Sequence, residues 1–107
     1  MLESFSLVLT AHAAFGTLAA LILPAQPVRR FTREEAAIVA RALLAVATGA
    51  SSERQIYMSP IASDHDFEAR VGEDGIFIAD GNGGETPLDW AQTRMLAGVL
   101  ARFGATA

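Results

Sequence analysis

The stretch SFSLVLTAHAAFGTLAALIL, residues 4–23, decides the fold of this chain. Its twenty residues carry no formal charge, and Arg29 and Arg30 follow shortly after it. A segment of this length and composition can cross a bilayer as one helix, with the arginines as its anchors. His12, however, would then lie near the middle of the span, where a polar ring is costly. A transmembrane helix over residues 4–23 is therefore one of two interpretations of this stretch.

The other interpretation rests on the alternation in the first half of the stretch. Polar and apolar side chains alternate through residues 4–13, and Val8 is the one exception. Such a period of two is typical of a strand and is unexplained by a helix. We expect two buried strands, Phe5–Ala11 and Thr17–Leu23, joined by a turn near Gly16. We prefer this soluble hairpin to the transmembrane helix.

Two capping motifs predict two helices further along the chain. Residues 32–35, Thr-Arg-Glu-Glu, have the form of a capping box, and their helix should end near the Thr-Gly pair at residues 48–49. Residues 86–89, Thr-Pro-Leu-Asp, repeat the arrangement with proline at the first helical position. That second helix should run to about Phe103. Residues 36–47 of the first helix are apolar nearly all round, so we expect a sheet to cover one side and a partner or the second helix to cover another.

Strand patterns lie between the two predicted helices. Residues 55–61 are apolar and β-prone as far as Pro60, which should end the strand or place it at an edge. Residues 67–71 and 76–78 flank a turn at residues 72–75 and therefore predict a hairpin. The predicted fold class is α+β, a small single domain with an antiparallel sheet and two main helices.

The two halves of the chain also resemble each other. Thr32 and Thr86, the two predicted helix caps, lie 54 residues apart, and an apolar triplet precedes each of them. One interpretation is a duplicated strand–strand–helix unit, with pseudo-repeats over residues 1–50 and 55–107. Common capping residues alone would produce a similar likeness, so the repeat supports the topology and implies no function.

The composition indicates one domain with more apolar residues than it can bury. The chain has 107 residues, of which 51% are hydrophobic, and its mean hydropathy is +0.32. A domain of this size has a large surface relative to its volume, so part of the apolar material should face a partner. We therefore expect a single domain over residues 1–107 that forms a homo-oligomer.

Cysteine content and charge exclude several classes of function. The chain has no cysteine, which excludes disulfides and zinc–thiolate sites. The formal net charge of −4 argues against direct nucleic-acid binding, because phosphates require a basic face. Glu3, with no Lys or Arg near it, makes the stretch that follows a poor secretory signal. We expect a cytoplasmic protein, and membrane association is the alternative.

His65, between Asp64 and Asp66, forms the one cluster that suggests chemistry. An imidazole flanked by carboxylates can serve as a metal half-site or an acid–base group, and His12 could complete a two-histidine site. A polar loop between two strands explains the same residues. The glycine-rich loop around Asn82 lacks both the glutamate of a calcium loop and the lysine of a phosphate loop. We assign no catalytic residue, no metal ligand and no cofactor.

Acidic residues concentrate in the second half of the chain. Residues 64–89 include eight acids and one arginine. Such a region can dock a basic partner or imitate nucleic acid in a basic groove, although an exposed hairpin needs the same charges for solubility. The candidate interaction residues are Asp64, Asp66, Glu68, Glu73, Asp74, Asp80 and Glu85.

The sequence therefore favours a small non-enzymatic binding or regulatory protein that engages another macromolecule through its acidic surface. Phage-type inhibitors and toxin-neutralising proteins belong to this class. One alternative is a small metal-binding protein or enzyme that uses His12 and His65 with Asp64 and Asp66. The other alternative is a membrane-tethered subunit anchored by a helix over residues 4–23.

Overall fold

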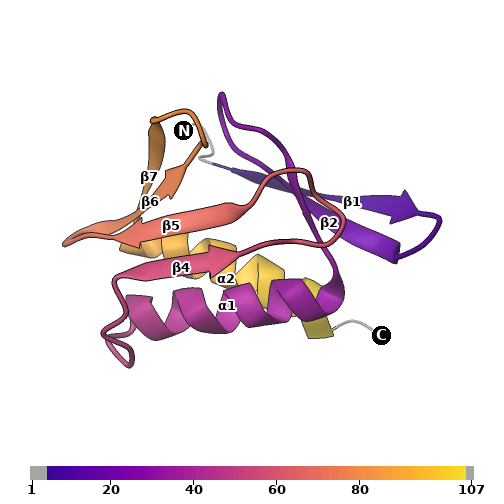
Figure 1. Cartoon of the computed structure of the whole chain (residues 1–107). Coiled ribbons are helices and arrows are strands. Elements are labelled where there is room, and N and C mark those ends of the chain that lie inside the picture. Colours follow the sequence, from indigo (N-terminus) through magenta and orange to yellow (C-terminus); the bar gives the residue numbers. More distant parts are fainter. Residues whose placement is uncertain (1–4, 106–107) are drawn as a thin grey trace.

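The computed structural model describes residues 5–105, which form an α+β fold with two antiparallel sheets and two helices (Figure 1). The first sheet has three strands in the order β1-β2-β3, and the second has four in the order β4-β5-β6-β7. A helix follows each sheet in the chain. The elements are β1 (Ser6–His12), β2 (Gly16–Ile22), β3 (Arg29–Phe31), α1 (Arg33–Ala47), β4 (Gln55–Met58), β5 (Phe67–Val71), β6 (Gly75–Ala79), β7 (Glu85–Asp89) and α2 (Trp90–Ala105).

The uncharged stretch forms the predicted hairpin, so the interpretation as a single helix is wrong. β1 and β2 pair antiparallel along their whole length. At the tip, Nδ1 of His12 accepts hydrogen bonds from the N–H groups of Ala14 and Phe15, and Gly16 adopts a φ of 74°. Neither helix within residues 5–105 is long and apolar enough to cross a membrane. Ser4, at the start of the predicted stretch, lies outside the described residues.

The burial of β1 differs from the prediction. β2 is buried from Leu18 to Leu21, as expected for a central strand. β1 was expected to be buried as well, but Val8 is 46% exposed and Leu9 is 60% exposed. The physical reason is that β1 lies at an edge and has one neighbouring strand, β2. Alternation in a sequence identifies a strand, but it does not reveal how many elements cover it.

The first helix begins as predicted, whereas the second begins later. In α1 the N–H of Glu35 donates to the Thr32 hydroxyl (3.2 Å), and the N–H of Thr32 donates to the Glu35 carboxylate (2.9 Å). In the second half, Thr86 and its proline neighbour belong to β7, and Asp89 occupies the capping position of α2. The N–H of Gln92 donates to Asp89 Oδ1 (2.7 Å), and the N–H of Asp89 donates to Gln92 Oε1 (2.9 Å).

Two further differences concern the sheets. The sequence predicts one antiparallel sheet, whereas the described chain has two, because none of the strands β1–β3 pairs with any of β4–β7. In addition, β3 and β7 are strands where no strand was predicted. β4 ends at Met58, before Pro60, as the proline predicted. β7 tolerates Pro87 because it is an edge strand, where one side makes no hydrogen bonds to another strand.

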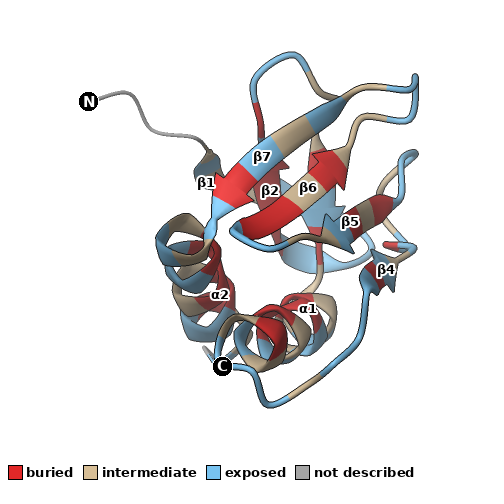
Figure 2. Cartoon of the chain, turned by 90° about the vertical axis from the view of Figure 1, so that its left-hand side faces the viewer, coloured by how far each residue is buried: buried red, intermediate tan, exposed pale blue. Residues whose placement is uncertain are grey.

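Both helices lie on the same side of the strands and enclose one hydrophobic core with them (Figures 1 and 2). Arg33, at the start of α1, donates to the carbonyl of Phe103 near the end of α2 (2.9 Å), so the helices run antiparallel. Phe31 from the first sheet meets Phe67 from the second edge to face, with ring centroids 5.9 Å apart. Every layer therefore contributes to a single core.

Burial and strand register in the two halves correspond at an offset of 57 residues. At this offset Thr32, the cap of α1, corresponds to Asp89, the cap of α2, whereas the sequence pattern aligned it with Thr86. The buried positions of the helices follow the same offset. They are Ala36, Val39, Ala40, Leu43 and Val46 in α1, and Thr93, Leu96, Ala97, Leu100 and Phe103 in α2.

The same offset relates the pairing of the strands that precede each helix. The β2–β3 pairs Ala19↔Phe31, Ala20↔Arg30 and Leu21↔Arg29 correspond to the β6–β7 pairs Ile76↔Leu88, Phe77↔Pro87 and Ile78↔Thr86. The elements that correspond are three strands and a helix in each half, whereas the sequence pattern suggested two strands and a helix. The second sheet contains one additional strand, β4, beside β5.

Candidate binding face

The four-stranded sheet has a polar face that is turned away from the core. Ile56, Ile76 and Ile78 are buried on the inner face, and their neighbours along each strand point outward. This outer face, called the binding face below, combines charged and aromatic side chains on neighbouring strands. It carries Gln55 and Tyr57 of β4, Glu68 and Arg70 of β5, Phe77 and Ala79 of β6, and Glu85 of β7.

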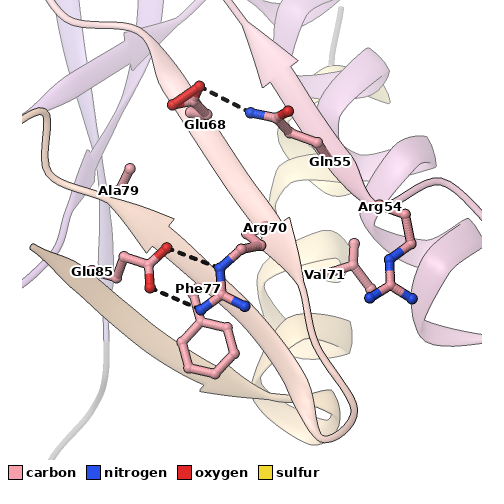
Figure 3. A pocket seen from close by; sticks show the side chains of 8 residues that line it. All are labelled: Arg54, Gln55, Glu68, Arg70, Val71, Phe77, Ala79 and Glu85. Carbon is pink, nitrogen blue, oxygen red and sulfur yellow. Dashed lines mark hydrogen bonds and ion pairs between the residues drawn. The ribbon is translucent and has the colours of Figure 1, made fainter. Parts of the chain in front are cut away.

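One pocket on the binding face has balanced charge, and we call it the mixed-charge pocket (Figure 3). Arg70 forms two hydrogen bonds with Glu85, at 2.9 and 3.2 Å, and its guanidinium lies 4.3 Å from the centre of the Phe77 ring. The bonds from Arg70 lower the pKa of Glu85 and raise that of Arg70 itself. The pocket has a volume of about 420 Å³ and is lined by Arg54, Gln55, Glu68, Arg70, Val71, Phe77, Ala79 and Glu85.

A second pocket adjoins the first and is strongly acidic. It shares Glu68 and Ala79 with the mixed-charge pocket, so the two lie side by side. Its volume is about 310 Å³. Four carboxylates line it against one guanidinium, and we call it the acidic pocket. Its lining is Arg29, Tyr57, Asp64, His65, Asp66, Glu68, Ala79, Asp80 and Gly81.

Tyr57 and Asp66 form the rim of the acidic pocket. The Tyr57 hydroxyl donates to Asp66 Oδ2 at 2.7 Å. This bond lowers the pKa of the Asp66 carboxyl, because it stabilises the ionised form, and it raises the pKa of Tyr57. The Tyr57 side chain remains 59% exposed, so its ring is available for contact with another molecule.

Arg29 is buried beneath the carboxylates, with 1% of the residue exposed. Its guanidinium donates to the carbonyls of Asp66 (3.0 Å), Ala79 (2.7 Å) and Pro27 (3.2 Å), and to the side-chain oxygen of Gln26. Burial lowers the pKa of Arg29, and the nearby Asp80 carboxylate opposes that shift. These hydrogen bonds go to neutral oxygens and not to the carboxylates that line the pocket.

The seven predicted interaction residues do not form one surface. Asp64, Asp66, Glu68 and Asp80 lie together in the acidic pocket, and Glu85 lies in the mixed-charge pocket paired with Arg70. The remaining two, Glu73 and Asp74, lie in the β5–β6 turn, at the opposite end of that hairpin from the acidic pocket. Asp80 also orders its own loop, because its Oδ1 accepts from the N–H groups of Asn82 (2.6 Å) and Gly84 (3.0 Å).

The two histidines occupy different places. His65 lines the acidic pocket, whereas His12 is at the tip of the β1–β2 hairpin of the other sheet. Within the part of the chain that the structure describes, no group of three or more His, Asp or Glu side chains is arranged to hold a metal ion. The acids of the pocket therefore surround a volume without converging on one point.

Sequence reasoning missed Arg29 and Tyr57 as parts of this site. Arg29 was interpreted only as a flank of the uncharged stretch, and a buried arginine in a three-residue strand leaves no sequence signal. Tyr57 could have been predicted to lie on the outer face, because neighbouring residues of a strand point to opposite faces and Ile56 is buried on the inner one.

Comparison of the chain with protein-family models, with curated proteins and with solved structures finds no match.

Proposed function

We propose that this chain is a non-enzymatic binding protein that docks a basic segment of another protein in its acidic pocket. The observation that carries this proposal is the charge of the pocket: Asp64, Asp66, Glu68 and Asp80 surround one buried arginine that already donates to protein oxygens. Opposite charge on a partner would speed encounter and fix its orientation.

The shape of the pocket favours an organic cation over a metal ion. The carboxylates of the described chain do not converge as metal ligands do, and they line about 310 Å³. An arginine or lysine side chain is extended and can reach several carboxylates at once. The exposed ring of Tyr57 on the rim offers a cation–π contact to the same side chain.

The proposal extends to the biological class that the sequence suggests. A small acidic protein that occupies a basic surface can act as an inhibitor of the phage type or can neutralise a toxin. A cytoplasmic location and a homo-oligomeric state remain part of this proposal. Each is independent of the pocket chemistry and needs its own measurement.

The proposal is tested by calorimetric titration with the peptide acetyl-Arg-Arg-Arg-amide at low salt. We expect binding that weakens as salt rises, because exposed charges are screened over ~10 Å at 0.1 M salt. The variant with Asp64→Asn and Asp80→Asn should bind roughly threefold to tenfold more weakly. The amide side chains keep the size of the originals, and the amide oxygen introduced by Asp80→Asn would still accept the loop hydrogen bonds.

The matched control changes Glu73→Gln and Asp74→Asn, which removes the same charge from the β5–β6 turn. This variant should bind within about twofold of the unmodified chain, a difference typical of distant charges. Equal losses in the two variants would mean that net charge alone attracts the peptide. Either that result or an absence of binding at low salt would contradict the proposal.

A further inference from the structure

The outer edge of β1 differs from the other three sheet edges of the described chain. β3 and β4 are edge strands of only three and four residues, and β7 carries Pro87 between Glu85 and Asp89. Short length, charge and proline are the features by which proteins discourage pairing at an edge. β1 has seven residues, and none of them is charged or proline. Its edge is therefore open to another strand.

A comparison of the two sheets also indicates that a strand could pair with the outer edge of β1. Leu21 of β2 is equivalent to Ile78 of β6, and their partners in the preceding strands are Leu7 and Ala69. Leu7 and Ala69 are therefore equivalent. On its other side Ala69 pairs with Ile56 of β4, whereas among residues 5–105 no strand lies beyond Leu7. In the second sheet β4 therefore occupies the position beside β5 that, in the first sheet, is unoccupied beside β1.

We propose that β1 pairs antiparallel with β1 of a second copy of this chain, which joins the two three-stranded sheets into one sheet of six strands. A contact about a two-fold axis places the same surface on both sides. A charged strand would then meet its own charge and be repelled. β1 is uncharged although the chain carries −4, so it suits a copy of itself better than it suits a charged partner.

The number of main-chain hydrogen bonds in this contact would lie within the range of a typical interface. Two strands of seven residues form about seven main-chain hydrogen bonds, compared with about 10 ± 5 in a typical interface. Leu9 is the middle residue of β1, so symmetric pairing brings the two Leu9 side chains together. Leu9 and Val8 are among the exposed large hydrophobic residues of the single chain, and the contact covers them.

This contact is on the other sheet from the acidic pocket, so it goes beyond the proposed docking function and can fail separately. A variant that no longer dimerises can still be tested for peptide binding, so binding in the acidic pocket and pairing through β1 are measured separately. The alternative apolar surface for self-association is the outer side of α1, where Ile38 and Leu44 flank the exposed Arg41. That surface supplies the matched control.

A cysteine introduced into β1 tests the contact directly, because the chain has no cysteine of its own. Opposite residues of an antiparallel pair have Cα atoms about 4.5–5.5 Å apart, a separation that a disulfide can bridge. Under mild oxidation the Leu9→Cys variant should form a covalent dimer in high yield. The Leu44→Cys variant, with a cysteine on the outer side of α1, should remain a single chain.

Light scattering on charged variants completes the test. At tens of micromolar (roughly the range in which weak interfaces saturate), the unmodified chain should have twice the mass of one chain. Leu9→Lys should halve that mass, and Leu44→Lys should leave it unchanged, with circular dichroism showing that both variants are folded. Any other combination of masses, or covalent dimers of Leu44→Cys in place of Leu9→Cys, would overturn the proposal.

Discussion

At the scale of single residues, Arg29 joins the two sheets. It belongs to β3, but its guanidinium donates to the carbonyls of Asp66, directly before β5, and Ala79, the last residue of β6. A charge that is 1% exposed is stable only where hydrogen bonds replace water. The sequence could not predict this role, because β3 is too short to show alternation and its acceptors lie 37 and 50 residues away.

Replacing Arg29→Met should reduce the free energy of unfolding by about 3 kcal/mol, because several buried carbonyls would lose their donor. Arg30→Met removes the same charge from an exposed neighbour and should change stability by about 0.5 kcal/mol or less. Urea denaturation of the two variants measures the difference. Similar stability of the two variants would show that Arg29 does not join the sheets.

Tyr57 is the single tyrosine of the chain, so its ionisation can be followed without interference. The hydrogen bond to Asp66 raises the pKa of Tyr57, since loss of the proton breaks the bond and leaves two negative charges adjacent. A spectrophotometric titration should therefore place the phenol midpoint above that of free tyrosine. Asp66→Asn should lower this midpoint. A midpoint unchanged by Asp66→Asn would mean that the rim contact is absent in solution.

At the scale of elements, the helix starts show what the sequence can and cannot decide. Thr32 and Glu35 cap α1 as predicted, because no competing cap lies nearby. In the second half, both Thr86 with Asp89 and Asp89 with Gln92 fit the capping pattern. Pairing of β7 with β6 decides between them, because it holds Thr86 and Pro87 in a strand. The proline at residue 87 hides that strand from sequence reasoning, since proline is rare inside strands.

Asp89→Ala should lower the free energy of unfolding by about 1 kcal/mol, because α2 loses the acceptor for its N-terminal N–H groups. Asp74→Ala alters a turn carboxylate close in sequence and should have a much smaller effect. Thermal or urea unfolding of both variants gives the comparison. If the two substitutions cost the same, Asp89 is not the cap of α2.

Residues 36–47 are apolar nearly all round, so the sequence does not show which side of this helix is buried. The structure shows that one side packs in the core and the other is exposed. Leu43 is fully buried, whereas its neighbour Leu44 is 48% exposed. Leu43→Arg should abolish cooperative unfolding, because an unpaired charge cannot be buried in the core. Leu44→Arg should change stability by about 0.5 kcal/mol or less. A folded Leu43→Arg variant, seen by circular dichroism, would contradict the position of α1.

At the scale of the whole molecule, a three-stranded sheet, a four-stranded sheet and two helices share one core. The fold class and most strands could be predicted from local patterns. The correct offset could not, because the equivalent residues share burial and register but rarely identity. The acidic concentration was also visible in the sequence, but only the fold shows that four of its members gather in one pocket while Glu73 and Asp74 lie elsewhere.

Binding of a basic segment in the acidic pocket is tested most directly by mapping backbone amide chemical shifts while acetyl-Arg-Arg-Arg-amide is added to the labelled chain. If the peptide binds in the acidic pocket, the largest changes should occur at residues that line it: Tyr57, residues 64–66, Glu68 and residues 79–81. The turn at Glu73 and Asp74 should change little, although it carries two adjacent acids. Largest changes at that turn, or changes spread evenly over every acidic residue, would contradict a binding site in the acidic pocket.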